Sequence, residues 1–183
     1  MTAKKKISTK HLILIPLFSA LICVGAFLKI PIGPVPMTLQ TIFVLLAGLL
    51  LGPVRGMAAV ALYVLMGLLG VPVFTSGGGP AYLLHPTFGY LLGMIVAAGI
   101  TGAIAAKSHS RNIAQNFLAS LLGLFVIYLF GLLWLYGIRN WYLAQQIPFG
   151  VLLRAGVLVF LPADVFWCAA ASILARRIAP HRL

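Results

Sequence analysis

Long apolar runs, separated by short breaks that contain proline, glycine or a few basic residues, dominate this sequence. Hydrophobic residues make up 62% of the 183 positions and charged residues only 8%. A soluble domain of this length carries about 25% charged residues, so this chain lacks the side chains that an aqueous surface requires. The composition therefore predicts an all-α integral membrane protein with a single membrane-embedded domain over residues 1–183.

The apolar runs predict six transmembrane helices, because a helix needs about 20 mostly apolar residues to cross a bilayer. The predicted spans are 12–30, 39–52, 56–70, 86–106, 113–137 and 162–178. The second and third are short, which suits helices that do not cross the full bilayer thickness. Pro162 divides the last apolar stretch, because its ring removes a backbone donor. Residues 148–160 are therefore predicted to form a separate short helix at the outer surface.

The basic residues set the predicted orientation of these spans. Cytoplasmic loops carry an excess of Lys and Arg, and most cations here fall at one end of the spans when both termini are cytoplasmic. That inner set is Lys4, Lys5, Lys6, Lys10, Arg55, Lys107, Arg111, Arg176, Arg177 and Arg182. The outer set is Lys29, Arg139 and Arg154. The net charge of +12 therefore reflects membrane topology, and because the cations form no continuous basic face, no nucleic acid is predicted as a partner.

Catalytic groups are scarce in this sequence. Asp164 is the single acidic residue, so no carboxylate pair is available for acid–base chemistry. Cys23 and Cys168 have no metal-ligand spacing, and Gly77–Gly79 is not followed by the Lys-Ser/Thr pair of a phosphate-binding loop. We therefore predict no enzyme activity, no metal site, no cofactor and no ATPase in this chain, and expect a binding protein.

A charge-free loop, residues 71–85, carries three consecutive glycines at 77–79 on the predicted outer side. Glycine lets a backbone approach a ligand closely because it has no Cβ. A flexible linker is the alternative interpretation. Linkers seldom combine glycine with apolar residues such as Phe74 and Tyr82, so we expect an extracellular lid over an apolar pocket.

The charged residues near the outer side supply candidate ligand contacts. Asp164 suits a ligand with N–H donors, although an acid in the first turn of a helix also favours the helix dipole. Arg154 is the preferred partner for a ligand carboxylate, ahead of Arg139 and Lys29, while snorkelling to the interface is its alternative role. His85 is a candidate for either ligand contact or helix capping.

Three motifs resemble those of a known family. The run Pro34–Gln40 (PVPMTLQ) resembles the PxPxTxQ signature that follows the first helix of BioY proteins. Gly70–Phe74, the glycines and Pro86–Gly93 resemble that family's third-loop and fourth-helix signature, and Pro162–Asp164 resembles the start of its last helix. The likeness extends in order over nearly the whole chain.

BioY proteins are the biotin-binding substrate subunits of energy-coupling factor transporters. The resemblance implies biotin uptake across the bacterial cytoplasmic membrane, with an energy-coupling transmembrane subunit and two ATP-binding cassette ATPase subunits as partners. The ligand-binding residues it implies, together with the residue-based candidates, are Thr38, Gln40, Phe74, Gly78, Tyr82, Tyr90, Arg154 and Asp164. Ser19 and Cys23 match the family's small-residue contact face for the coupling subunit.

The sequence departs from the family pattern near the last helix. Ala163 replaces a glycine and Trp167 stands in place of a lysine, so another cation must take any ligand-binding role of that lysine. A substrate subunit for a different vitamin, or a biotin transporter that works without the ATPase module, are the alternatives.

Overall fold

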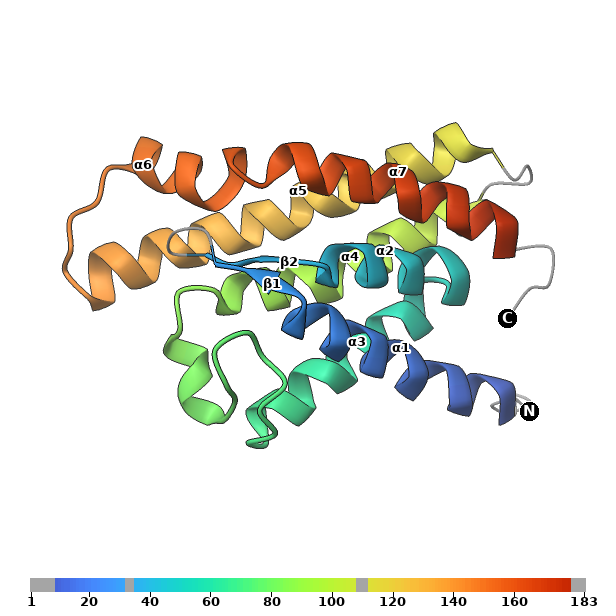
Figure 1. The fold of residues 1–183 in the computed structure, drawn as a ribbon, viewed down its shortest axis with the longest axis horizontal. Helices are drawn as coiled ribbons and strands as arrows, with labels where there is room; N and C mark the ends of the chain where they lie inside the picture. Colours follow the sequence, from blue (N-terminus) through green and yellow to red (C-terminus); the bar gives the residue numbers. More distant parts are fainter. Residues whose placement is uncertain (1–8, 32–34, 108–111, 179–183) are drawn as a thin grey trace, which may run out of the picture.

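Six helices of 12 to 25 residues form an elongated bundle in the computed structural model, which describes residues 9–31, 35–107 and 112–178 (Figure 1). They are α1 (Thr9–Phe27), α2 (Gln40–Leu51), α3 (Pro53–Leu68), α4 (Phe88–Lys107), α5 (Ile113–Gly137) and α7 (Leu161–Ile178). Lys4, Lys5, Lys6, Arg111 and Arg182 of the predicted inner set, and Pro34 of the signature, lie outside the described residues. The predicted helix positions are thus recovered within a few residues.

Shorter elements connect these helices. Strands β1 (Lys29–Ile30) and β2 (Met37–Thr38) pair as an antiparallel ribbon between α1 and α2. A 3-10 turn, η1 (Pro80–Leu84), lies in the loop 71–85, which we call the lid loop. After α5 come a π-helical turn η2 (Ile138–Tyr142), a short helix α6 (Phe149–Leu153) and a second π-helical turn η3 (Arg154–Leu158).

A sharp reversal joins the two short helices α2 and α3. Gly52 adopts a φ of 81°, a left-handed conformation that glycine adopts without strain. Pro53 then begins α3 at a position where a proline has no hydrogen bond to lose. At 12 and 16 residues, these helices reach only about 18 and 24 Å at a rise of 1.5 Å per residue.

Glycines allow α4 and α5 to pack closely together. A Cβ added at Gly93 would lie 2.9 Å from Cα of Ile127, and one added at Gly89 would lie 2.1 Å from Cβ of Trp134. Small residues at such contacts bring helix backbones together, which is how helices associate in membranes. The closely packed α4–α5 pair therefore forms a rigid wall of the bundle.

The separate helix predicted at 148–160 is found as α6 and η3, but only a turn at Val159 and Phe160 separates it from α7. Taken together, residues Phe149–Ile178 are a helical run of 30 residues, in which α7 follows α6 toward the chain end (Figure 1). The π-helical turn η3 absorbs the interruption, with Val159 N–H donating to the Arg154 carbonyl at 3.2 Å. Pro162 falls in the first turn of α7, where its missing donor costs little.

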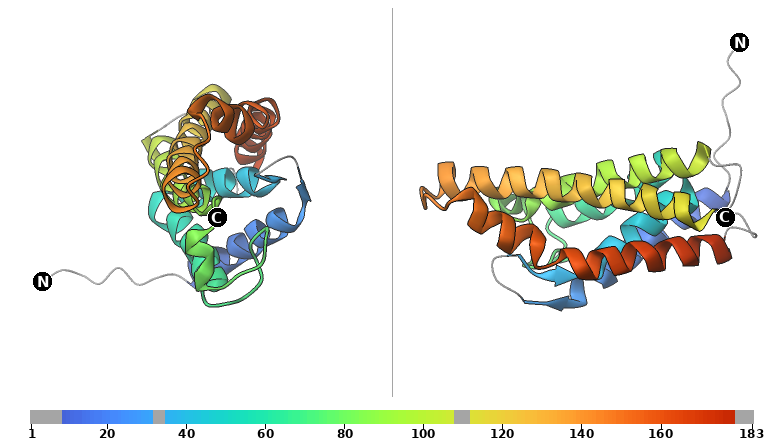
Figure 2. Two further views of the ribbon diagram at one scale, coloured as in Figure 1. Left: turned by 90° about the vertical axis from the view of Figure 1, so that its left-hand side faces the viewer. Right: turned by 90° about the horizontal axis from the view of Figure 1, so that it is seen from above.

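The ends of the helices segregate to opposite ends of the bundle. The start of α1, the α2–α3 reversal, the end of α4 and the end of α7 lie at one end in Figure 1, and the lid loop and the α5–α6 connection lie toward the other. The end-on panel of Figure 2 shows the lid loop (green) and the α5–α6 connection (orange) on the viewer's side. Lys107 lies in the last turn of α4, and Arg176 and Arg177 lie in the last turn of α7, so these three cations are at the first of the two ends.

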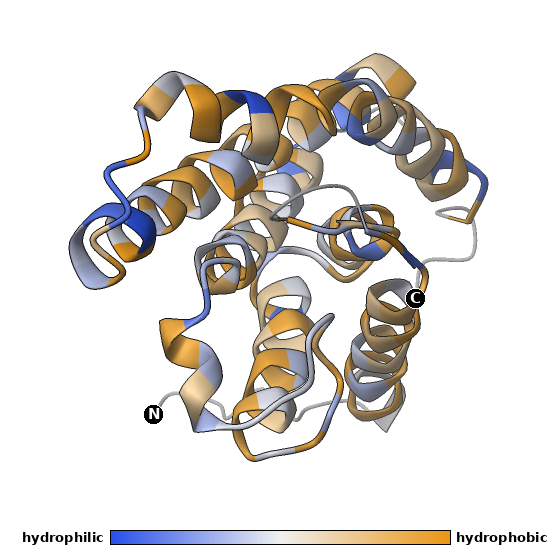
Figure 3. Ribbon diagram, turned by 60° about the vertical axis from the view of Figure 1, so that its left-hand side comes forward, coloured by the Kyte–Doolittle hydropathy of each residue, from blue (hydrophilic) through white to orange (hydrophobic). Residues whose placement is uncertain are grey.

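Apolar side chains cover the outside of the bundle. Leu17, Val24, Leu122, Phe125 and Leu133 are all at least half exposed, and hydrophobic colouring covers most of the helical surface in Figure 3. Within the described residues, Phe88–Lys107, Ile113–Tyr142 and Phe149–Ile178 are long and apolar enough to cross a membrane, while α1, α2 and α3 contribute shorter apolar helices. The protein is therefore membrane-embedded and mostly helical.

The glycine contacts between α4 and α5 yield a test of the fold. We expect Gly93→Leu to lower the thermal unfolding midpoint of the detergent-purified protein, because overpacking of this kind costs about 1–3 kcal/mol. Gly150→Ala is the matched control, since a Cβ at Gly150 meets no atom within 4 Å. Equal midpoints for Gly93→Leu and the control would contradict the close packing of α4 on α5.

Candidate ligand-binding site

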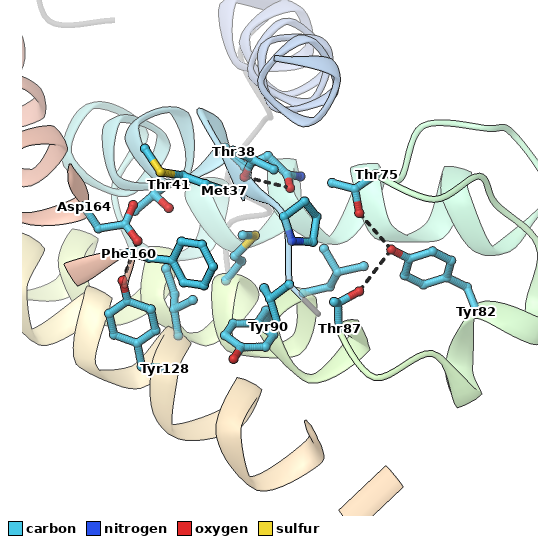
Figure 4. Close-up of a pocket in the computed structure, with 16 residues that line it drawn as sticks. Met37, Thr38, Thr41, Thr75, Tyr82, Thr87, Tyr90, Tyr128, Phe160 and Asp164 are labelled. Atoms are coloured by element: carbon cyan, nitrogen blue, oxygen red, sulfur yellow. Dashed lines mark hydrogen bonds between the residues drawn. The ribbon is translucent and has the colours of Figure 1, made fainter. Parts of the chain in front are cut away.

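A cavity of about 60 Å³ lies where α2, α4, α5 and α7 meet the β1–β2 ribbon and the lid loop (Figure 4). Its walls come from segments far apart in the sequence. The lining residues are Val35, Pro36, Met37, Thr38, Gln40, Thr41, Thr75, Tyr82, Thr87, Tyr90, Leu91, Met94, Ile127, Tyr128, Phe160 and Asp164. The described part of the lining contains one acidic residue and no cation.

Asp164 forms one side of the cavity. Its side chain is only 8% exposed, and its Oδ2 accepts a hydrogen bond of 2.5 Å from the Tyr128 hydroxyl on α5. Thr41 on α2 and Asp164 point toward one another across the top of this region (Figure 4). A buried carboxyl group needs hydrogen-bond donors to compensate for lost hydration, and α2 and α5 supply them here.

Apolar and aromatic side chains line the middle of the cavity. Tyr90 lies in the wall with its hydroxyl turned away, donating to the Gly156 carbonyl at 2.9 Å, so its ring presents a fixed face. Leu91, Met94 and Ile127 continue this surface along α4 and α5. Such a surface suits the apolar part of a ligand, as in most small-molecule pockets.

The opposite side of the cavity is polar and belongs to the lid loop. The Tyr82 hydroxyl lies 3.1 Å from Oγ1 of Thr75 and 3.1 Å from Oγ1 of Thr87 (Figure 4). Thr87 Oγ1 in turn lies 2.7 Å from Nδ1 of His85. This chain of side-chain hydrogen bonds ties the middle of the lid loop to its own end before α4.

The electrostatic environment of His85 favours its neutral form. Burial lowers the pKa of the His85 imidazole below its ordinary value, and the positive charge of Arg139 lowers it further. A neutral ring leaves one nitrogen able to accept, and Nδ1 accepts the Thr87 backbone N–H at 3.3 Å. The His85 ring therefore contacts Thr87 immediately before α4, and it does not line the cavity.

A second hydrogen-bond chain links the cavity wall to the lid loop. The buried Gln40 donates from Nε2 to the Tyr63 hydroxyl at 2.8 Å, and that hydroxyl donates to the Val73 carbonyl at 3.2 Å. Thr38 Oγ1 lies 3.4 Å from Oε1 of Gln40. Gln40 is thus held in one orientation, and its amide connects the pocket wall, through Tyr63, to the start of the lid loop.

The structure brings together five of the eight predicted ligand-binding residues in the cavity lining. These five are Thr38, Gln40, Tyr82, Tyr90 and Asp164. Phe74, Gly78 and Arg154 do not line it. Phe74 is 2% exposed and packs beneath the lid loop against Tyr82, with ring centroids 4.4 Å apart.

Gly78 and Arg154 have other structural roles. A Cβ at Gly78 would lie 2.3 Å from the Val71 carbonyl oxygen, so glycine is required here for the loop to fold on itself. Arg154 is exposed at the start of η3, and the intervening residues of η3 and α7 separate it from the lining. The sequence favours Arg154 as a ligand contact because it interrupts an apolar run. Such an interruption does not indicate the direction of the side chain.

The structure also shows the positions of the two predicted partner-contact residues and of Trp167, which stands in place of the family lysine. Ser19 is 1% exposed, because this face of α1 packs inside the bundle, and Cys23 is half-buried. Trp167 packs edge-on against Phe166, with centroids 5.0 Å apart, and does not line the cavity. The apolar surface of α1 that faces outward carries Leu17 and Val24 instead.

Sequence reasoning missed several polar lining residues, most importantly Thr41, Thr87 and Tyr128. Thr41 directly follows the PVPMTLQ motif and Thr87 lies within the fourth-helix motif, so both motifs contained the signal. Tyr128 occupies an otherwise apolar run on α5, and a hydroxyl inside a transmembrane helix is the signal that points to a buried partner.

These features define a class of protein: a small helical membrane protein with a cavity beneath a loop at one end of its bundle. Comparison with known proteins narrows the class. The model of the BioY family matches residues 1–182. A probable biotin transporter BioY of Lysinibacillus sphaericus is 40% identical over 174 residues, covering 95% of this chain and 89% of that protein.

Two further matches extend over nearly complete chains. A probable biotin transporter BioY of Pyrococcus horikoshii is 41% identical over 170 residues, covering 92% of this chain and 96% of that protein. The crystal structure of the S-component for biotin from an ECF-type ABC transporter is 31% identical and superposes with a TM-score of 0.85, covering 98% of this chain and 95% of that one. The chain belongs to the BioY family, whose named members are transporters rather than enzymes.

The Gly78 contact yields a test of the lid loop. We expect Gly78→Ala to increase hydrogen–deuterium exchange of residues 71–85 several-fold, because the added methyl group collides with the Val71 carbonyl and the loop must open. Ser76→Ala, an exposed position on the same loop, is the control. If Gly78→Ala exchanges like the wild type, Gly78 is not required for the loop conformation.

Proposed function

We propose that this protein is the biotin-binding substrate subunit of an energy-coupling factor transporter. The single observation that supports this most directly is the placement of Asp164, the only acid of the chain, in the wall of a lid-covered cavity. The family membership and the biotin S-component structure with the same fold add to it.

The cavity's chemistry matches the parts of biotin. The ureido ring carries two N–H donors, and a carboxyl group that accepts hydrogen bonds suits them. Tyr128 holds Oδ2 of Asp164, so the second carboxyl oxygen is oriented toward Thr41 and the ligand. The thiophane ring and the aliphatic chain then lie against Tyr90, Leu91 and Met94, where dispersion contacts replace water.

In this proposal biotin reaches the cavity past the lid loop. Opening of the lid loop would break the side-chain hydrogen bonds that Tyr82 and Tyr63 make with it. Opening admits biotin, and closure buries it with these bonds restored.

Transport follows from the placement of the pocket within a membrane protein. In this proposal the helices α1, α2, α3, α4, α5 and α7 are the six membrane-embedded segments of one domain, both termini are cytoplasmic, and the lid loop faces outward in a bacterial cytoplasmic membrane. An energy-coupling transmembrane subunit and two ATP-binding cassette ATPases supply the energy, because this chain has no phosphate-binding loop of its own. Ser19 and Cys23 lie too far inside the bundle to form that contact alone, and the outward face of α1 extends it.

The role of Asp164 is tested by Asp164→Asn. We expect more than tenfold weaker biotin binding, measured by calorimetry on detergent-purified protein, because the amide replaces an acceptor with a donor and a charge-assisted hydrogen bond is worth about 1.5–3 kcal/mol. Tyr128→Phe should weaken binding less, since it only releases the carboxyl group.

Ser172→Ala is the control for this pair. Ser172 is buried on the same helix, and its hydroxyl donates to the Cys168 carbonyl, but it does not line the cavity. Biotin binding should therefore be unchanged. Wild-type affinity for Asp164→Asn, in protein that unfolds at the wild-type temperature, would exclude Asp164 from the binding site.

A further inference from the structure

Lys29 occupies the place where the β1–β2 ribbon meets the lid loop. It pairs with Thr38 in the register of the ribbon, and its Nζ donates a hydrogen bond to the Thr75 backbone carbonyl. Thr38 and Thr75 both line the cavity, although Lys29 itself does not. The ammonium group is therefore positioned at the rim of the pocket, between two of its lining residues.

The other predicted outer cations are placed differently. Arg139 donates from Nη1 to Oε1 of Gln145 at 2.8 Å, within the connection between α5 and α6. Arg154 is exposed at the start of η3. Neither lines the cavity or bonds to a residue that lines it. Among these three cations, only Lys29 contacts the pocket lining.

The polar groups of the pocket lie on two sides. In Figure 4, Asp164, Tyr128 and Thr41 gather on one side, while Thr75, Tyr82 and Thr87 gather on the other, with Tyr90 between them. A ligand with N–H donors at one end and an anionic group at the other matches this arrangement. Lys29, bonded to Thr75, supplies positive charge on the side away from Asp164.

From these contacts, and resting on the proposed function, we propose that Lys29 recognises the carboxylate of biotin and determines selectivity for the free acid. An ammonium group has three donors, so Lys29 can keep its bond to the Thr75 carbonyl while it donates to a ligand carboxylate. One residue then joins the ribbon, the lid loop and the ligand. The bound carboxylate stabilises the closed lid through the same ammonium group.

The experiment compares biotin with biotin methyl ester, which keeps the ureido and thiophane rings but has no negative charge. Affinities are measured by calorimetry for the wild type, Lys29→Met, Lys29→Arg and Arg154→Gln in detergent. We expect Lys29→Met to weaken biotin binding roughly ten- to hundredfold, the range of a charge-assisted hydrogen bond, and to change ester binding little. Lys29→Arg should retain most of the preference for the acid, and Arg154→Gln all of it.

Three outcomes would overturn the proposal. Equal losses for acid and ester in Lys29→Met would show that Lys29 only latches the lid loop. Loss of the acid preference in Arg154→Gln, with Lys29→Met unaffected, would assign the carboxylate to Arg154. If the wild type bound biotin and its methyl ester with equal affinity, no residue would recognise the carboxylate. Absence of biotin binding to the folded wild type would instead contradict the proposed function itself.

Discussion

The buried carboxyl group of Asp164 is the constraint around which the pocket is built. A carboxyl group inside an apolar bundle is costly unless hydrogen-bond donors surround it, and this one recruits Tyr128 from α5 and faces Thr41 on α2. Three helices from different parts of the chain are thereby held in register at one point. The close, glycine-mediated packing of α4 on α5 keeps the Tyr128 side of this arrangement fixed.

The lid loop is joined to this framework by polar contacts rather than by apolar packing alone. Gln40 and Tyr63 connect the pocket wall to Val73, and Tyr82 connects Thr75 to Thr87. Beneath them Phe74 fills the space beside Gly67, where no Cβ would fit. Side-chain hydrogen bonds of this kind contribute about 0.5–1.5 kcal/mol each, so together they stabilise the observed position of the loop by only a few kcal/mol.

Much of this architecture follows from the sequence because membrane helices are encoded by composition and length. The helix positions were predictable, and of the predicted ligand-binding residues, Asp164 and the motif residues Thr38 and Gln40 line the cavity. The near-continuity of residues 149–178 was not predictable, because a proline in an apolar run indicates an interruption but not how short that interruption is. The sequence also did not indicate the directions of side chains. Arg154 and Lys29 are both predicted outer cations, and only the pairing of β1 with β2 shows that Lys29 reaches the pocket rim.

Calorimetric titration of the purified wild-type protein with biotin, with lipoate as a comparison ligand, tests the central claim most directly. Lipoate has a sulfur-containing ring and an aliphatic carboxylate chain but no ureido group, so it separates recognition by Asp164 from general apolar binding. The account predicts saturable one-to-one binding of biotin and much weaker binding of lipoate. Equal binding of both ligands, or no saturable heat from biotin with folded protein, would contradict it.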